Sequence, residues 1–305
     1  MSDSIEAKNL VKKYGKLIAV NDVSFSVKKG EIFGLLGENG AGKTTTLEMI
    51  EGLRKPTSGK ILILGKDARK NMAEIKELIG VQLQSSAYFD YLSLKDILQL
   101  FGSFYTKQID PDKLLEMVDL THKANSYVSQ LSGGQKQRFS IVASLVNDPE
   151  VVFLDEPTTG LDPLARRNLW DVITKIRKQG KTIIITTHYM EEAERLCDRV
   201  AIMDAGKILI MGETHKLIDK VKNPYRVTFY TENLALKILK EIKACCGEVS
   251  KPNGKNNYYE LEIKDKKLFN QILDIIQKNK IEDFTVGRAT LEDLFLELTG
   301  KRIEE

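Results

Sequence analysis

The stretch from Gly37 to Thr45, GENGAGKTT, has the spacing of a loop that holds phosphate groups. Its glycines let the backbone bend so that N–H groups point at phosphate oxygens, and a helix that starts after Lys43 adds positive charge at its N-terminus. Lys43 can reach the β and γ phosphates, and the Thr44 hydroxyl suits Mg²⁺, which prefers hard oxygen ligands. The sequence therefore predicts a nucleotide-binding loop. Its expected contact residues are Gly37, Glu38, Asn39, Gly40, Ala41, Gly42, Lys43, Thr44 and Thr45.

Two acidic residues and a histidine follow later apolar runs of the chain. Asp155 is expected to hold the same Mg²⁺ as Thr44, which leaves the adjacent Glu156 free to orient or deprotonate a water molecule. An alternative is that Glu156 only caps the turn that follows it. His188 is expected to contact the γ-phosphate or to steer the water, although a histidine after a strand is more often structural. Together these residues predict hydrolysis of a nucleoside triphosphate.

A second glycine-containing motif, LSGGQKQR, extends from Leu131 to Arg138. Ser132, Gly133 and Gly134 precede a segment with helical apolar spacing, so they form the expected start of a helix and a second anion site. One nucleotide needs only one phosphate loop. The motif could enclose the ATP of its own chain or close over that of a neighbour, and its spacing alone does not decide between the two.

The elements that position these residues are short, continuously apolar runs. IFGLL at 32–36, VVFL at 151–154 and TIIITT at 182–187 have the pattern of strands buried on both faces, as in parallel sheets. Each run ends at a residue or loop that can handle phosphate, and ligands of open parallel sheets bind beyond the carboxyl ends of the strands. The pattern predicts an α/β fold in which the scattered motifs form one site.

The composition of the chain limits the classes of partner and the compartment that can be expected. The 305 residues include 46 Lys plus Arg and 43 Asp plus Glu, and a net charge of +3 argues against nucleic acid as the main partner. Three cysteines, Cys197, Cys245 and Cys246, have no metal-ligand spacing and indicate a reducing cytosol. No export signal and no apolar run of about 18 residues is visible, so the chain is not expected to cross a bilayer.

The pattern of apolar and polar runs in the sequence changes near residue 222. We expect one domain over 1–222, with a mostly helical subdomain at about 85–147, and an accessory domain over 223–305. After Pro224 the alternating and helical runs follow the order βαββαβ, which predicts a ferredoxin-like fold. TLEDLFLELTGK then predicts a terminal helix that begins at the capping pair Thr290 and Asp293 and ends at Gly300.

The order of these motifs resembles the nucleotide-binding subunit of ATP-binding cassette (ABC) transporters over roughly residues 4–220. The resemblance implies a P-loop NTPase cassette with a parallel-sheet core, an N-terminal antiparallel β part and a helical insertion. In that family two cassettes meet head to tail, and each LSGGQ closes on the ATP that the other chain binds. The residues of this chain expected at the partner's ATP are Leu131, Ser132, Gly133, Gly134 and Gln135.

Three further roles come from the resemblance alone. Tyr14 matches the aromatic residue that stacks on adenine, although by itself it is equally a packing aromatic. Gln84 matches the glutamine that touches Mg²⁺ and the attacking water, and Asp162 matches the aspartate of the loop that crosses the dimer seam. In that family the corresponding insertion receives a short helix of the membrane protein, so the resemblance leaves two roles for Tyr88, Phe89 and Tyr91: they line that groove or they belong to the small core of the insertion.

The resemblance implies an ATPase subunit of a membrane exporter, working with Mg²⁺, a second cassette that is a copy or a paralogue, and a separate polytopic permease. The chain is then expected to be cytoplasmic and peripheral at the inner face of the membrane. The tail resembles those of daunorubicin and other antibiotic-resistance and surface-polymer export ATPases. Two alternatives remain open at this stage: a soluble cassette ATPase that acts on nucleic acid or ribosomes, and a nucleotide-dependent regulator.

Overall fold

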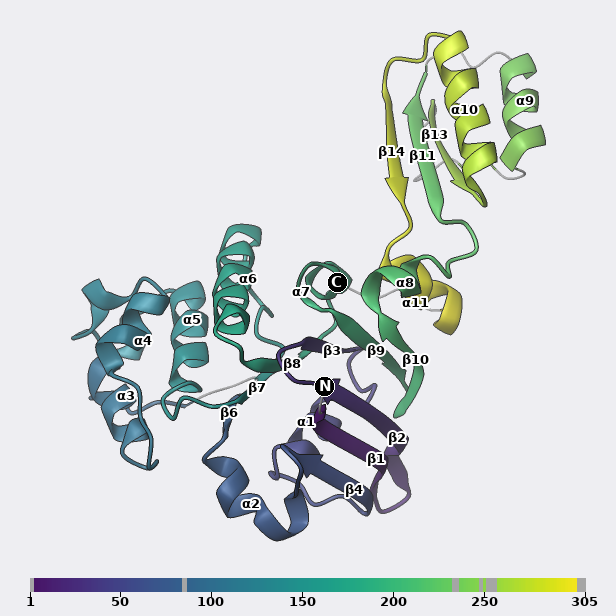
Figure 1. Ribbon diagram of the computed structural model, residues 1–305. Coiled ribbons are helices and arrows are strands. Elements are labelled where there is room, and N and C mark those ends of the chain that lie inside the picture. The colour runs from purple at the N-terminus through teal and green to yellow at the C-terminus, as the bar shows by residue number, and fades with distance from the viewer. Residues whose placement is uncertain (1–2, 84–86, 232–235, 247–248, 251–256, 301–305) are drawn as a thin grey trace. The chain divides into compact units, whose positions relative to one another are not determined.

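The computed structural model describes residues 3–83, 87–231, 236–246, 249–250 and 257–300 (Figure 1). The chain divides into two compact units, Met1–Glu213 and Thr214–Glu305. The boundary between the units lies before the change in sequence pattern near residue 222. The reason is that helix α8 (Thr214–Ile218) packs against α11 (Leu291–Thr299) of the second unit. Within the described residues no helix has both the length and the apolarity that a membrane crossing needs.

A six-stranded sheet forms the centre of the first unit, with strand order β10-β9-β3-β8-β7-β6. All neighbouring strands run parallel except β10, which pairs antiparallel to β9. The strands are β3 (Ile32–Leu36), β6 (Ile79–Gln82), β7 (Val151–Asp155), β8 (Thr182–Thr187), β9 (Arg199–Asp204) and β10 (Lys207–Glu213). The three apolar runs noted in the sequence are β3, β7 and β8, and every residue of these strands is buried.

The register of this sheet brings the motif residues together. Leu36 at the end of β3 lies opposite Thr187 at the end of β8, and Asp155 at the end of β7 lies opposite Thr186. The three strands therefore end at one edge, and the loops that follow them begin side by side. This confirms the expectation that the carboxyl ends of the apolar runs define one crevice.

A second, antiparallel sheet of order β2-β1-β4-β5 shares a core with the central sheet. Its strands are β1 (Asp3–Tyr14), β2 (Leu17–Lys28), β4 (Ser58–Ile63) and β5 (Lys66–Asp67). Phe25 of this sheet stacks on Phe33 of β3, with ring centroids 5.2 Å apart. This is the N-terminal antiparallel part that the resemblance implies.

The helices of the first unit are α1 (Lys43–Ile50), α2 (Ala68–Lys76), α3 (Leu94–Gly102), α4 (Pro111–Met117), α5 (Gly133–Ala143), α6 (Pro163–Lys178) and α7 (Met190–Leu196). Two short 3₁₀ turns span Thr121–Lys123 and Val128–Gln130. Figure 1 shows α3, α4 and α5 gathered beyond the β6 and β7 side of the sheet, and these helices contact one another. They form the expected helical insertion.

The second unit has the element order β11 (Tyr225–Tyr230), α9 (Leu236–Cys246), β12 (Val249–Ser250), β13 (Tyr258–Ile263), α10 (Lys266–Lys278), β14 (Phe284–Arg288) and α11. The order is the expected βαββαβ, in an antiparallel sheet β12-β13-β11-β14. Thr290 and Asp293 form a capping box at the start of α11, and Gly300 ends that helix in a left-handed conformation, as the sequence predicts. Side chains of Cys245 and Cys246 lie outside the described residues.

Candidate functional site

The loop between β3 and α1 is shaped by close backbone contacts. At Gly37 an added Cβ would lie 2.3 Å from the carbonyl oxygen of Met203, and at Gly42 it would lie 2.6 Å from that of Ala19. Gly42 also has φ of 97°, a conformation that disfavours any other residue. Only glycine therefore fits at these two positions. In the rest of the loop, Ala41 is buried, Glu38, Thr44 and Thr45 are half-buried, and Asn39 and Gly40 are exposed.

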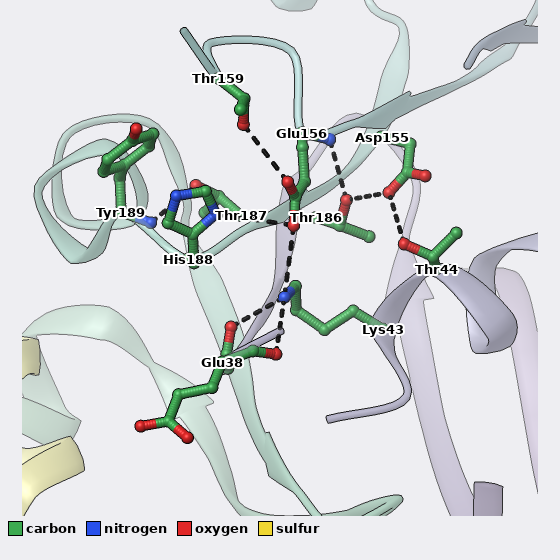
Figure 2. Close-up of polar contacts among 11 residues, drawn as sticks. Glu38, Lys43, Thr44, Asp155, Glu156, Thr159, Thr186, Thr187, His188 and Tyr189 are labelled. Atoms are coloured by element: carbon green, nitrogen blue, oxygen red, sulfur yellow. Dashed lines mark hydrogen bonds and ion pairs between the residues drawn. The ribbon is translucent and has the colours of Figure 1, made fainter. Parts of the chain in front are cut away.

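Lys43, the first residue of α1, points back into the loop (Figure 2). Its Nζ donates to the carbonyl oxygens of Gly37, at 2.8 Å, and Glu38, at 3.0 Å, and lies 3.4 Å from Oε1 of Glu156. Burial lowers the pKa of Lys43, and the Glu156 carboxylate opposes that shift. The loop thus holds a buried ammonium at the place where a phosphate loop needs its cation.

Asp155, at the end of β7, accepts hydrogen bonds from two threonines. Thr44 Oγ1 donates to Asp155 Oδ1 at 3.2 Å, and Thr186 Oγ1 donates to the same oxygen. Burial raises the pKa of Asp155, and these two hydrogen bonds oppose the shift. The hydroxyl of Thr44 and the carboxylate of Asp155 are adjacent hard oxygen donors, so this donor set fits Mg²⁺ with its remaining ligands from phosphate and water.

Glu156 is buried, with 6% of its surface exposed, and its backbone φ is 46°. The left-handed region is rare for a residue with a side chain, and here the Glu156 N–H donates to Thr186 at both its carbonyl oxygen, 3.1 Å, and its hydroxyl, 3.0 Å. These bonds fix the turn that follows β7. The Glu156 side chain also accepts a hydrogen bond from the Thr159 hydroxyl in that turn, as a capping role requires, and its role in hydrolysis stays a prediction.

Three groups surround the Glu156 carboxylate (Figure 2). His188 Nδ1 lies 3.5 Å and Lys43 Nζ 3.4 Å from Oε1, while the Thr159 hydroxyl donates to Oε2 at 3.3 Å. His188 lowers the pKa of Glu156 most, Lys43 adds to this, and burial opposes both, leaving a pKa of about 2. The carboxylate is ionised at neutral pH and sits between a cation of the phosphate loop and the histidine that follows β8.

Thr186 is a site residue that the sequence reasoning missed. Its hydroxyl bonds Asp155 and Glu156 at once, and it is fully buried. Two threonines at the end of the otherwise aliphatic run TIIITT were the available signal, because a buried hydroxyl requires a polar partner. The sequence points to polar partners there but not to which residues they are.

Ser132 and Gln135 of the LSGGQ motif hydrogen-bond to each other within their own segment. Ser132 is the N-cap of α5: its hydroxyl accepts from the Gln135 N–H at 3.3 Å, and its own N–H donates to Gln135 Oε1 at 3.0 Å. Leu131 is buried beneath the turn, whereas Ser132 and Gly133 are exposed and Gly134 is half-buried. Among the described residues, no hydrogen bond or ion pair joins 131–135 to the phosphate loop at 37–45.

The three residues carried over from the resemblance have different settings. Asp162 is the N-cap of α6 and accepts from the N–H groups of Leu164 and Ala165, at 3.0 and 2.9 Å. Tyr14, at the end of β1, is 40% exposed, and Lys12 Nζ lies 5.1 Å from its ring centroid. Gln84 lies outside the described residues. Roles for all three in binding ATP stay predictions.

Comparisons with known proteins agree with this geometry. The family model described as ABC transporter matches residues 20–159. The Nod factor export ATP-binding protein I of Burkholderia orbicola (strain AU 1054) is 36% identical over 99% of this chain and 98% of its own length. Its counterpart in Rhizobium leguminosarum bv. viciae is 38% identical over 99% of this chain and 96% of its own. A dimeric post-hydrolysis structure of the ATP-binding cassette MJ0796, bound to ADP and Pi, has a TM-score of 0.62 at 26% identity, covering 68% of this chain and 98% of that one.

Proposed function

Because this chain belongs to the ABC transporter family as an ATP-binding subunit, and is an ATPase of that family, we propose that it hydrolyses MgATP in a pocket completed by a second, facing cassette. We further propose that hydrolysis drives a separate transmembrane permease, with this subunit held at the inner face of the cell membrane. The observation that carries the proposal is the meeting of Lys43, Asp155 and Glu156 at one edge of the parallel sheet.

The phosphates of ATP are the natural partners of the Lys43 ammonium. When the triphosphate enters the loop, its charge competes with the Glu156 carboxylate and the two carbonyl oxygens that now hold Nζ. Thr44 and Asp155 would hold the Mg²⁺, which would supply positive charge to offset that of the phosphates. The chain's own residues thus account for binding and orientation of the triphosphate.

Glu156 is the group that we assign to the attacking water. With a pKa of about 2, its carboxylate is a weak base while Lys43 lies beside it. Movement of the ammonium onto the phosphates removes one cause of the low pKa, so the basicity of Glu156 rises when substrate is bound. His188 stays on the other side of the same oxygen and orients it. The carboxylate is therefore activated by the nucleotide whose hydrolysis it assists.

A second cassette is proposed because LSGGQ presents an unused anion site. Ser132 and Gly133 are exposed at the N-terminus of α5, and the segment has no bond to the phosphate loop of its own chain. A facing copy would bring this helix end onto the γ-phosphate held by Lys43. The MJ0796 cassette, whose structure is a dimer in a post-hydrolysis state bound to ADP and Pi, supports this arrangement.

Export is the direction of transport that we propose. The curated relatives that match nearly the whole chain are named for Nod factor export, and the likeness includes the second unit as well as the cassette. Contacts with the cargo belong to the permease, so the chemical nature of the cargo is not inferred from this subunit.

The proposal is tested with Glu156→Gln, which keeps the shape of the side chain and removes its charge. The variant should bind MgATP and form dimers that light scattering detects in saturating nucleotide. The dimers should persist because ATP that is not hydrolysed stays bound between the two cassettes. Adding Ser132→Arg to this variant serves as the matched control, since it should prevent dimers while the monomer still binds nucleotide. A Glu156→Gln protein that stays monomeric would overturn the shared pocket.

A further inference from the structure

Glu192 is a buried acid of α7 that the proposed hydrolysis does not use. It follows His188 by four residues, and none of its surface is exposed. Its Oε1 atom accepts a hydrogen bond of 3.1 Å from the indole Nε1 of Trp170, a buried residue of α6. Burial of a carboxyl group is unfavourable unless polar groups surround it, so the partners of Glu192 indicate what holds it there.

Two further polar neighbours of Glu192 come from the turns that carry the site residues. Burial raises the pKa of Glu192, and the hydroxyl groups of Thr187 and Thr158 are among the groups that oppose this rise. Thr158 is a buried residue of the turn after Glu156, and Thr187 is buried directly before His188. Glu192 therefore lies close to both turns whose side chains meet at the Glu156 carboxylate.

A second contact from α6 reaches the turn of His188. The guanidinium carbon of Arg166 lies 4.1 Å from the ring centroid of Tyr189, which in turn lies 4.1 Å from that of His188. The Tyr189 N–H also donates to the Thr187 hydroxyl at 3.0 Å (Figure 2). Arg166 and Trp170 are four residues apart and thus neighbours on one face of α6. This face of α6 holds the start of α7 at two points.

The contact between α6 and α7 links the two turns of the hydrolytic site. α6 begins after its N-cap Asp162, in the turn that follows Glu156, and α7 begins directly after Tyr189. The position of one helix on the other therefore bears on the 3.5 Å separation between His188 Nδ1 and Glu156 Oε1. Misplacement of a catalytic group by about 1 Å can lower a rate by about 100-fold. For packing alone, an aliphatic side chain would serve without the unfavourable burial of a carboxyl group.

We propose that Glu192 is a positioning residue for hydrolysis: through Trp170 it holds α7 on α6 and so keeps His188 at the Glu156 carboxylate. The inference rests on the proposed hydrolysis at Glu156 and adds a residue that acts through His188. The partners of Glu192 named above belong to α6 and to the turns after β7 and β8, whereas the phosphate loop follows β3. Its effect is therefore expected on the hydrolytic step rather than on the binding of ATP.

The experiment measures phosphate release by the full-length chain over a range of MgATP concentrations. Glu192→Leu removes the acceptor of the indole N–H and should lower kcat by about 10-fold or more, while KM stays within about twofold. Glu192→Gln keeps an acceptor oxygen and should recover kcat to within about threefold of the wild type. Trp170→Phe removes the donor and should match Glu192→Leu. Glu191→Leu, at an exposed neighbour on α7, is the matched control and should stay within about twofold.

Two further measurements separate positioning from folding. Because Glu192 acts through His188, adding Glu192→Leu to His188→Ala should lower the remaining rate by less than about twofold, since both changes remove the same interaction. Thermal unfolding of each variant checks that a loss of turnover is not a loss of folding. If Glu192→Leu does not fold, Trp170→Phe takes its place in both measurements.

The outcomes separate this inference from the proposed function. A wild-type chain that does not hydrolyse MgATP would remove the proposed function itself. Wild-type turnover in Glu192→Leu and Trp170→Phe, or a loss in Glu192→Gln as large as that in Glu192→Leu, would overturn the role of Glu192 while hydrolysis stands. A rise in KM with kcat unchanged, or full additivity with His188→Ala, would also overturn it, since Glu192 would then act on binding or independently of His188.

Discussion

Glu156 and Glu51 are two buried glutamates of the same domain whose pKa values move in opposite directions. Both start from an ordinary value of 4.5, and burial raises both. In Glu156 the contacts with His188 and Lys43 exceed the effect of burial and leave a pKa of about 2. In Glu51 the charges of Asp155 and Glu48 act in the same direction as burial, and the pKa rises to about 8. The partners of a carboxylate, more than its depth, decide its charge.

The comparison separates a carboxylate that charged and polar groups surround from a carboxyl group whose charge is governed mainly by burial. The carboxylate of Glu156 already has an ammonium, an imidazole and a hydroxyl around it. Glu51 lines a groove beside β6 and α5, and its Oε1 atom has no hydrogen-bond partner among the residues that the structure describes. We infer that the first glutamate serves hydrolysis within the cassette, whereas the second is held protonated at neutral pH by its burial, and both sides of this contrast can be tested.

The largest expected effect is on turnover. Glu156→Gln should lower the ATPase rate by about 10²- to 10⁴-fold, the usual value of help from a general base, because an amide cannot take a proton from water. Glu51→Gln, the same substitution at the other buried glutamate, should leave the rate of the isolated subunit within about twofold. A phosphate-release assay at saturating MgATP makes the measurement. Equal losses of the ATPase rate in the two variants would contradict the different roles inferred for the two glutamates.

The next effect is on stability in alkaline solution. The pKa of Glu51 is raised in the folded chain, so folding favours its protonated form, and stability is lost as pH rises from about 4.5 through 8. At about 1.36 kcal/mol per unit of pKa, the loss has an upper bound of about 5 kcal/mol. Chemical denaturation of the wild type and Glu51→Gln between pH 5 and about 9 should show the variant gaining relative stability as pH rises.

Glu156 should give the opposite slope in acid. Its pKa is lowered in the folded chain, so its stabilisation is present above about 4.5 and is lost as pH falls toward 2. The difference corresponds to about 3 kcal/mol. Comparison of wild type with Glu156→Gln over that range cancels the titration of other acids. Parallel stability curves for the two proteins would mean that His188 and Lys43 do not hold the carboxylate as described.

Much of the fold and of the nucleotide site could be predicted from the sequence, because short local patterns of apolar residues and glycines determine these parts of the structure. The run TIIITT is apolar enough to be a buried strand, and GENGAGKTT encodes its own backbone geometry through glycine. The burial of Glu51 could not be predicted, because a glutamate at the end of a helix, as in LEMIEGL, is expected to be exposed. Its burial arises from groups distant in sequence, such as β6 and α5, that form the groove around it.

A smaller effect is expected at Thr186, which positions both acidic residues. Thr186→Val removes the hydroxyl that donates to Asp155 and accepts from the Glu156 N–H. The loss of a buried hydrogen bond is worth about 1–3 kcal/mol, so turnover should fall by about 10-fold or more. Thr186→Ser keeps the hydroxyl and should restore most of the rate. A valine variant with the wild-type rate and pH profile would remove Thr186 from the positioning of the site.

The smallest effect is expected at Thr159, whose hydroxyl is a weaker partner of the Glu156 carboxylate than His188 and Lys43. Its hydroxyl donates to Oε2 at 3.3 Å, a long bond, and the turn that carries it is also held by a backbone bond from the Thr159 N–H to the Glu156 carbonyl. Thr159→Val should therefore lower turnover by no more than about threefold, within the range of a weak neutral hydrogen bond. The steady-state ATPase rate and its decrease at acidic pH are measured together. A fall as large as that of Glu156→Gln would show that Thr159, rather than His188 and Lys43, controls the carboxylate, and the explanation given for its low pKa would then have to be replaced.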